Sequence, residues 1–220
     1  YKYRMALAMV EAAERGDTWN DRTLKPDGIV CDASAGNCAP ALAFVCAVKG
    51  YKAKLAIYKP MLRGDGTRLK ITGAFGPDVC QSRPPDDFLD EDELRYFLEK
   101  DYDLTHIVAG KTHCYELEKD NPDVVWVDQI FNKYNYLGQM QMGREIHRQL
   151  EGKVDVFGCA VGSGATLLGV ALALEEKGAK PLTYGVVPHG SEVYMELDKA
   201  EADRGEFRKS TAMRNLADKM

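Results

Sequence analysis

Short apolar runs alternate with longer segments of helical periodicity along most of the chain, and this alternation limits the possible folds more than any other feature. The apolar runs are continuous, which is typical of parallel strands buried on both faces. Strands separated by helices indicate βαβ units, so we predict an α/β fold of open, mostly parallel sheets with helices on both faces. The expected strands are 28–32, 54–58, 78–81, 106–109, 124–128, 154–160 and 181–187, and the expected helices are 3–15, 39–49, 67–75, 91–100, 137–150 and 165–177.

Composition and charge exclude several classes of protein. The chain has 220 residues and a formal net charge of -5, so it has no excess of cations to displace counterions and we expect no nucleic-acid partner. The longest apolar run, 39–48, is about half of the roughly 20 residues that cross a bilayer, so we expect no membrane span. The 6 cysteines are scattered without a C-x-x-C pair, which favours reduced thiols in a cytoplasm and no metal site.

The N-terminal segment shows no secretion signal. The apolar stretch 5–10 is interrupted by Glu11 and Glu14, and no cleavage site follows it. Helical periodicity is already present from Tyr1, so we expect the chain to be part of a longer protein.

The turn 161–166, with the sequence VGSGAT, joins a predicted strand to a predicted helix. The amides of a helix's first turn have no partner within the helix, so they and the two hydroxyls can bind a phosphate. The alternative is a tight turn with close helix packing. A dinucleotide site is disfavoured, because Leu167 stands where a third glycine is required and no acid ends the strand 181–187.

Two further segments resemble ligand-binding motifs. Gly110-Lys111-Thr112 resembles the end of a P-loop, but Thr105 stands where that motif needs its first glycine, so we predict that Lys111 is a surface residue. The turn 33–38 lies between a predicted strand and a helix that we expect to begin near Pro40. Asn37 either caps this helix or, with the backbone amides, holds a second anionic group.

Several motifs, taken in order, resemble the cysteine synthases, which are pyridoxal-phosphate (PLP) enzymes of the tryptophan synthase β-subunit type. The motifs are Lys2-Tyr3-Arg4, Ser34-Ala35-Gly36-Asn37, Val48-Lys49-Gly50-Tyr51, Gly73-Ala74-Phe75-Gly76, Asp128-Gln129 with Asn132 and Asn135, and Gly162-Ser163-Gly164-Ala165-Thr166. They cover nearly all of the chain from residue 2 to residue 188. The resemblance implies the fold of the tryptophan synthase β-subunit type and a PLP cofactor.

The resemblance also implies roles for individual residues in holding the cofactor. Lys2 matches the catalytic lysine that condenses with the cofactor's aldehyde and removes the α-proton of the substrate. Asn37 matches the asparagine that hydrogen-bonds the 3-hydroxyl of the ring, and Gly185 matches the pocket wall. The residues that match the phosphate-binding loop are Gly162, Ser163, Gly164, Ala165 and Thr166.

The implied substrate is an activated serine-like or cysteine-like amino acid that undergoes β-replacement or β-elimination. Gln129 matches a glutamine near the substrate carboxylate, and the loop that grips this carboxylate corresponds to Ser34, Ala35, Gly36 and Cys38. Cys38 replaces a hydroxyl donor with a weaker thiol donor. A thiol at a helix N-terminus has a lowered pKa, so a reactive Cys38 thiolate is a second interpretation.

The resemblance implies a division into two domains and a homodimer. Residues 1–30 and 140–220 are assigned to a larger, partial domain that binds the cofactor phosphate, and residues 31–139 to a smaller domain with the substrate loop. The altered loop leaves an alternative open, in which the chain is a catalytically silent relative that serves as a binding or regulatory module.

Overall fold

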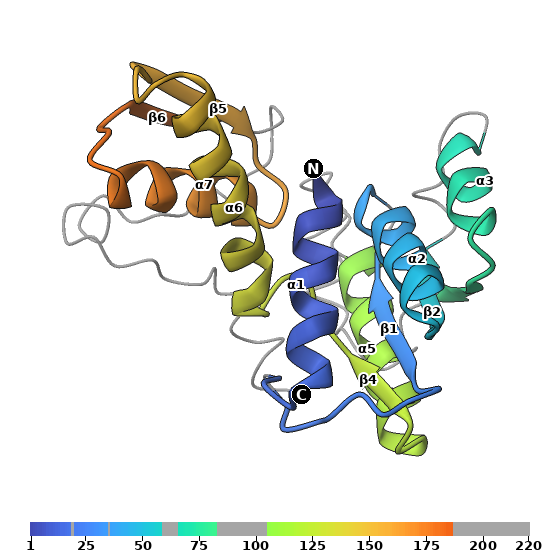
Figure 1. Ribbon diagram of the computed structural model, residues 1–220. Coiled ribbons are helices and arrows are strands. Elements are labelled where there is room, and N and C mark those ends of the chain that lie inside the picture. Colours follow the sequence, from blue (N-terminus) through green and yellow to red (C-terminus); the bar gives the residue numbers. More distant parts are fainter. Residues whose placement is uncertain (19, 35, 59–65, 83–104, 187–220) are drawn as a thin grey trace, which may run out of the picture.

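The computed structural model describes residues 1–18, 20–34, 36–58, 66–82 and 105–186 (Figure 1). The predicted helix 91–100, residues 187–220 and Ala35 lie outside the described residues. In chain order the elements are α1 (Lys2–Glu14), β1 (Ile29–Ala33), α2 (Cys38–Lys49), β2 (Lys52–Tyr58), α3 (Thr67–Gly73), β3 (Asp78–Ser82), α5 (Thr105–Asp120), β4 (Val124–Trp126), α6 (Lys133–Gln149), β5 (Val156–Ala160), α7 (Ala165–Glu176) and β6 (Leu182–Val186).

The described strands form two sheets, and all of their pairings are parallel. The first sheet has 4 strands in the order β3-β2-β1-β4, and the second has 2 strands, β5 and β6. In the first sheet Ile29 pairs with both Lys52 and Val124, so β1 lies in the middle. The predicted α/β class with parallel sheets is confirmed. The carboxyl ends of β1 and β4 meet at one edge of the first sheet, which places the segments after Ala33 and Trp126 side by side.

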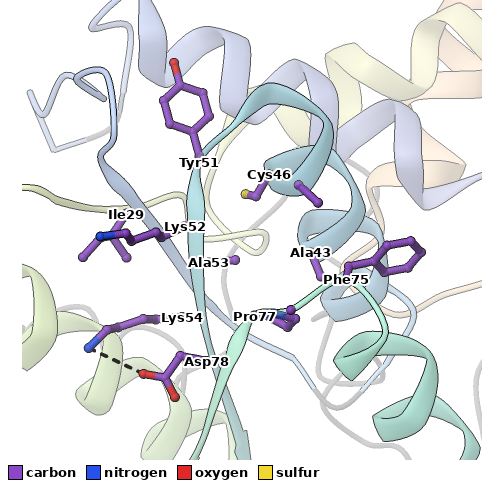
Figure 2. A pocket seen from close by; sticks show the side chains of 12 residues that line it. Ile29, Ala43, Cys46, Tyr51, Lys52, Ala53, Lys54, Phe75, Pro77 and Asp78 are labelled. Carbon is purple, nitrogen blue, oxygen red and sulfur yellow. Dashed lines mark ion pairs between the residues drawn. The ribbon is translucent and has the colours of Figure 1, made fainter.

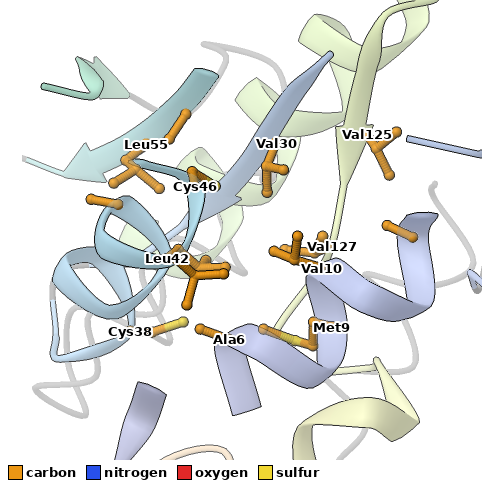
Figure 3. Packing of buried hydrophobic residues seen from close by; sticks show 14 of the residues in the cluster. Ala6, Met9, Val10, Val30, Cys38, Leu42, Cys46, Leu55, Val125 and Val127 are labelled. Atoms are coloured by element: carbon orange, nitrogen blue, oxygen red, sulfur yellow. The ribbon is translucent and has the colours of Figure 1, made fainter. Parts of the chain in front are cut away.

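Helices cover both faces of the first sheet. Successive side chains along a strand point to opposite faces, so neighbouring residues pack against different helices. Val30, Leu55 and Val125 belong to a buried cluster with α1 and α2, which Figure 3 shows. Cys31 and Trp126, each one position away from a member of that cluster, pack on the other face with Cys114 of α5. Burial of the central strand on both faces is why it is a continuous apolar run in the sequence.

Helices α1, α6 and α7 connect the two sheets through close backbone contacts. A Cβ atom added at Gly138 of α6 would lie 2.7 Å from the carbonyl oxygen of Arg4 in α1. A Cβ atom at Gly169 of α7 would lie 2.2 Å from the carbonyl oxygen of Tyr136 in α6. These distances are too short for a side chain, so glycine allows the three helices to pack backbone against backbone.

One predicted strand is wrong, and another is present but not buried. Residues 106–109 belong to helix α5, because a short apolar run does not distinguish a buried strand from part of a helix. Strand β6 is exposed along its whole length, with Leu182 at 69% and Tyr184 at 51% exposure. Its apolar sequence therefore does not reflect burial among the described residues.

Candidate active site

The loop that follows β1 presents polar groups at the start of α2. Ser34 is buried, and its Oγ accepts the amide hydrogen of Gly36 at 3.2 Å. Asn37 is the N-cap residue of α2, but its side chain is exposed and makes no capping hydrogen bond. Asn37 therefore occupies the capping position without making the capping bond, so its carboxamide is not used to cap the helix. Helix α2 begins at Cys38, one residue before the expected range 39–49 and two before Pro40.

The loop before α7 leaves an open helix N-terminus. Gly164 is the N-cap with φ +78°, a left-handed conformation that favours glycine, and no side chain caps the helix. A Cβ atom added at Gly162 or Gly164 would meet no atom within 4 Å. Close packing thus does not explain these two glycines. Since the first turn carries no acidic residue, the uncapped amides suit an anion.

One segment after β4 links the loops at β1 and α7. The Gln129 side-chain amide donates to the carbonyl oxygen of Ala33 at 2.9 Å. The Asn135 side-chain amide donates to the carbonyl oxygen of Gln129 and, at 3.1 Å, to Oγ of Ser163. The substrate loop and the phosphate loop of the sequence interpretation are therefore joined by one chain of hydrogen bonds. Asn135 is part of one of the matching motifs, but no role could be predicted for it, because its bridge depends on two loops that are distant along the chain.

Lys2, the first residue of α1, is half-buried rather than part of an exposed, frayed terminus. Burial lowers the pKa of its amine, and the thiols of Cys38 and Cys159 act in the opposite direction. The amine is therefore within electrostatic range of a thiol at the start of α2 and of a thiol on strand β5. In β6, Gly185 pairs with Cys159, and a Cβ atom at Gly185 would lie 2.5 Å from Cγ2 of Val161. The predicted residues from the beginning, middle and end of the described chain thus gather in one region.

A buried cluster of charges lies directly beneath the loop after β1. Lys111 is 1% exposed, so the prediction that it lies on the surface is wrong. Its Nζ lies 2.6 Å from Oδ2 of Asp128, and it also lies 4.9 Å and 4.1 Å from the ring centroids of Trp126 and Phe131. The helical pattern of α5 did not reveal this lysine's burial, because its partner follows another strand of the sheet.

Asp32 of β1 belongs to the same cluster. It is 1% exposed, and its Oδ1 accepts the amide hydrogen of Ala33 at 2.9 Å. Burial, and then the negative charge of Asp128, raise the pKa of Asp32 to about 7. Hydrogen bonds from the backbone and the charge of Lys111 act in the opposite direction.

The Cys38 thiol lies over this carboxyl group and is 2% exposed. Its Sγ donates to Oδ2 of Asp32 at 3.8 Å. Burial, and then the charge of Asp32, raise the pKa of Cys38 well above its ordinary value. The interpretation of Cys38 as a reactive thiolate is therefore wrong, because desolvation and a neighbouring carboxylate outweigh the helix N-terminus.

A separate groove of about 340 Å³ lies at the opposite edge of the first sheet (Figure 2). Its walls include Ile29 at the start of β1, Phe75, and the ion pair between Lys54 and Asp78, whose charged atoms lie 3.7 Å apart. None of the predicted site residues lines this groove. Within the described parts of the chain, no group of three or more metal-ligating side chains could hold an ion, and no helix is long and apolar enough to span a membrane.

Parallel sheets with uncapped helix N-termini directly after strands are typical of α/β proteins that bind an anionic ligand at the carboxyl ends of their strands. The model of the pyridoxal-phosphate dependent enzyme family matches residues 1–220, and the chain belongs to this family. The resemblance inferred from the motifs is confirmed.

The chain is also similar in sequence to individual enzymes. The chain is 32% identical over 193 residues to cysteine synthase 1 of Emericella nidulans, a match that covers 86% of this chain and 45% of the relative. It is 29% identical over 191 residues to cystathionine beta-synthase of Rattus norvegicus, a match that covers 86% of this chain and 30% of the relative. The chain thus spans less than half the length of these curated relatives.

Solved structures show the same fold. A hydrogen sulfide-producing enzyme from Fusobacterium nucleatum superimposes with a TM-score of 0.65 and 28% identity over 89% of this chain and 55% of the other. A cysteine synthase from Entamoeba histolytica superimposes with a TM-score of 0.68 and 23% identity, over 89% of this chain and 50% of the other.

Proposed function

We propose that this protein catalyses PLP-dependent β-replacement or β-elimination on an activated serine-like or cysteine-like amino acid, in the manner of a cysteine synthase. The observation that carries the proposal is the position of the half-buried Lys2 amine near both Cys38 and Cys159. The relatives named as cysteine synthase and cystathionine beta-synthase support the same reaction class.

The residues on the described loops fit a phosphorylated aromatic aldehyde. The cofactor phosphate would bind at the uncapped start of α7, held by the amides and hydroxyls of the loop Gly162, Ser163, Gly164, Ala165 and Thr166. The exposed carboxamide of Asn37 would bind the ring hydroxyl, and Gly185 would form part of the wall. When bound, PLP supplies an electron sink for negative charge on the substrate's α-carbon.

The chain's own groups bind the substrate and move its proton. Ser34 and the amides at the start of α2 would bind the substrate carboxylate, with Gln129 holding their loop through the carbonyl oxygen of Ala33. Lys2 would accept the α-proton at Nζ. Burial lowers the pKa of this amine, which increases the fraction of neutral amine near neutral pH.

Borohydride reduction followed by peptide mass mapping tests the proposal. In the full-length protein loaded with PLP, reduction should leave the pyridoxyl group on the peptide that contains Lys2. Lys2→Ala should lose the label and the absorbance band of the bound cofactor, whereas the exposed Lys153→Ala should keep both. A label on another lysine would refute the assignment.

Spectral titration with O-acetylserine, O-phosphoserine, serine, cysteine and threonine then identifies the substrate. A new absorbance band with one of them supports catalysis. Bound cofactor without a spectral response to any of them would favour the silent binding module.

We also propose that the protein is a cytoplasmic homodimer in which residues 1–30 and 140–220 form the larger domain and residues 31–139 the smaller one. The 6 free cysteines suit a reducing compartment. Light scattering on the full-length protein tests the dimer, and a monomeric mass would contradict it.

A further inference from the structure

The buried charge cluster lies next to the loop that would bind the substrate carboxylate. Asp32 is the last residue but one of β1, and the loop that begins at Ser34 follows it directly. Its carboxyl group accepts the Ala33 amide at 2.9 Å and faces the Cys38 thiol at 3.8 Å, so it contacts the loop at both ends. Nothing in the reaction proposed above uses this group.

The groups around Asp32 include more acid than base. Among the described residues, the ionisable groups that act on Asp32 or respond to it are Cys38 of α2, Lys111 and Cys114 of α5, and Asp128 after β4. Lys111 is already paired with Asp128 at 2.6 Å. An ionised Asp32 would therefore leave one negative charge in the interior that no ion pair balances.

We propose that Asp32 is a positioning residue for the substrate, which takes up a proton when a carboxylate binds to the loop above it. This inference rests on the proposed function, since it assumes that the loop binds a carboxylate. An anion bound at the uncapped start of α2 would lie near the Asp32 carboxylate, because the Cys38 side chain in the first turn contacts this carboxylate at 3.8 Å. Like charges repel strongly where water is excluded, so the protonated form of Asp32 and the bound anion stabilise each other.

The coupling has a measurable size. At the effective dielectric of about 20 that suits protein interiors, like charges separated by up to about 10 Å repel strongly enough to change binding by at least tenfold. Because linkage is reciprocal, the substrate should raise the pKa of Asp32 by about one, and ionisation of Asp32 should weaken carboxylate binding about tenfold. Since the pKa of Asp32 is about 7 without ligand, this shift takes it to about 8 in the complex, and most of the change falls between about pH 6 and pH 9.

The test uses propionate, which has the carboxylate of the substrate but not its amine. Propionate binding to the full-length holoenzyme is followed through the cofactor absorbance between pH 6 and pH 8. Affinity should fall about fivefold across this range in the wild type, which is part of the full tenfold effect because the bound state titrates near pH 8. In Asp32→Asn the fall should disappear and affinity should stay near the low-pH value, whereas Asp123→Asn, which removes an exposed carboxylate, should behave as the wild type.

A second measurement does not depend on a folded variant. At pH 7.5 an indicator dye should record uptake of about half a proton per propionate bound to the wild type, from the shift in pKa given above. Absence of proton uptake, or an unchanged pH dependence in Asp32→Asn, would overturn the coupling while leaving the proposed function intact. If propionate does not bind at any pH, the carboxylate loop is wrong and both proposals fail.

Discussion

Removing the positive charge from the buried Lys111–Asp128 pair should strongly destabilise the protein. Both side chains are at most 3% exposed, and the charged atoms lie 2.6 Å apart. Lys111→Met keeps most of the side-chain length but leaves the Asp128 carboxylate buried without its partner. Breaking one side of a buried ion pair costs about 3–5 kcal/mol, so we expect a loss of this size in the free energy of unfolding.

Urea denaturation of the full-length protein, followed by intrinsic fluorescence, measures this loss. Arg144→Met is the matched control, because Arg144 and Glu176 form an ion pair of 2.8 Å in which both side chains are more than 40% exposed. Exposed pairs contribute at most about 1 kcal/mol, so the control should lose little. The double variant Lys111→Met/Asp128→Asn should recover much of the stability, because it removes both charges. Equal losses for Lys111→Met and Arg144→Met would refute the reasoning.

Three further predictions concern other parts of the fold. Burial raises the pKa of Asp32 from an ordinary value near 4 to about 7, so its contribution to stability is present below pH 4 and is lost as pH rises to 7. The free energy of unfolding should therefore fall by about 2–3 kcal/mol from this group between pH 5 and pH 8, and Asp32→Asn should lack that slope in urea melts at these two pH values. Gly138→Ala should cost about 1–3 kcal/mol, since the new Cβ atom would lie 2.7 Å from the Arg4 carbonyl oxygen, whereas Gly73→Ala, with open space around it, should cost nothing in thermal unfolding. Burial raises the pKa of Cys46 to about 12, so alkylation at pH 8 followed by peptide mapping should leave Cys46 unmodified until the protein unfolds, and early modification would show that the helix opens locally.

Much of the fold and of the candidate site could be predicted from local sequence patterns. The continuous apolar run at 28–32 correctly indicated a buried strand, because helices cover this strand on both faces. The ordered motifs led to the correct family. The same local reasoning failed at 106–109, where an apolar run within α5 resembles a strand.

The sequence by itself determined the order of elements, the parallel sheets and the residue types at each turn, since these depend on neighbours along the chain. Tertiary structure decided which charges are buried and which loops meet. Lys111 changed from an expected surface residue to half of a buried ion pair, and Cys38 from a candidate thiolate to a protonated thiol over Asp32. The physical reason is that desolvation and charge–charge energies depend on distances between segments that only the folded chain brings together.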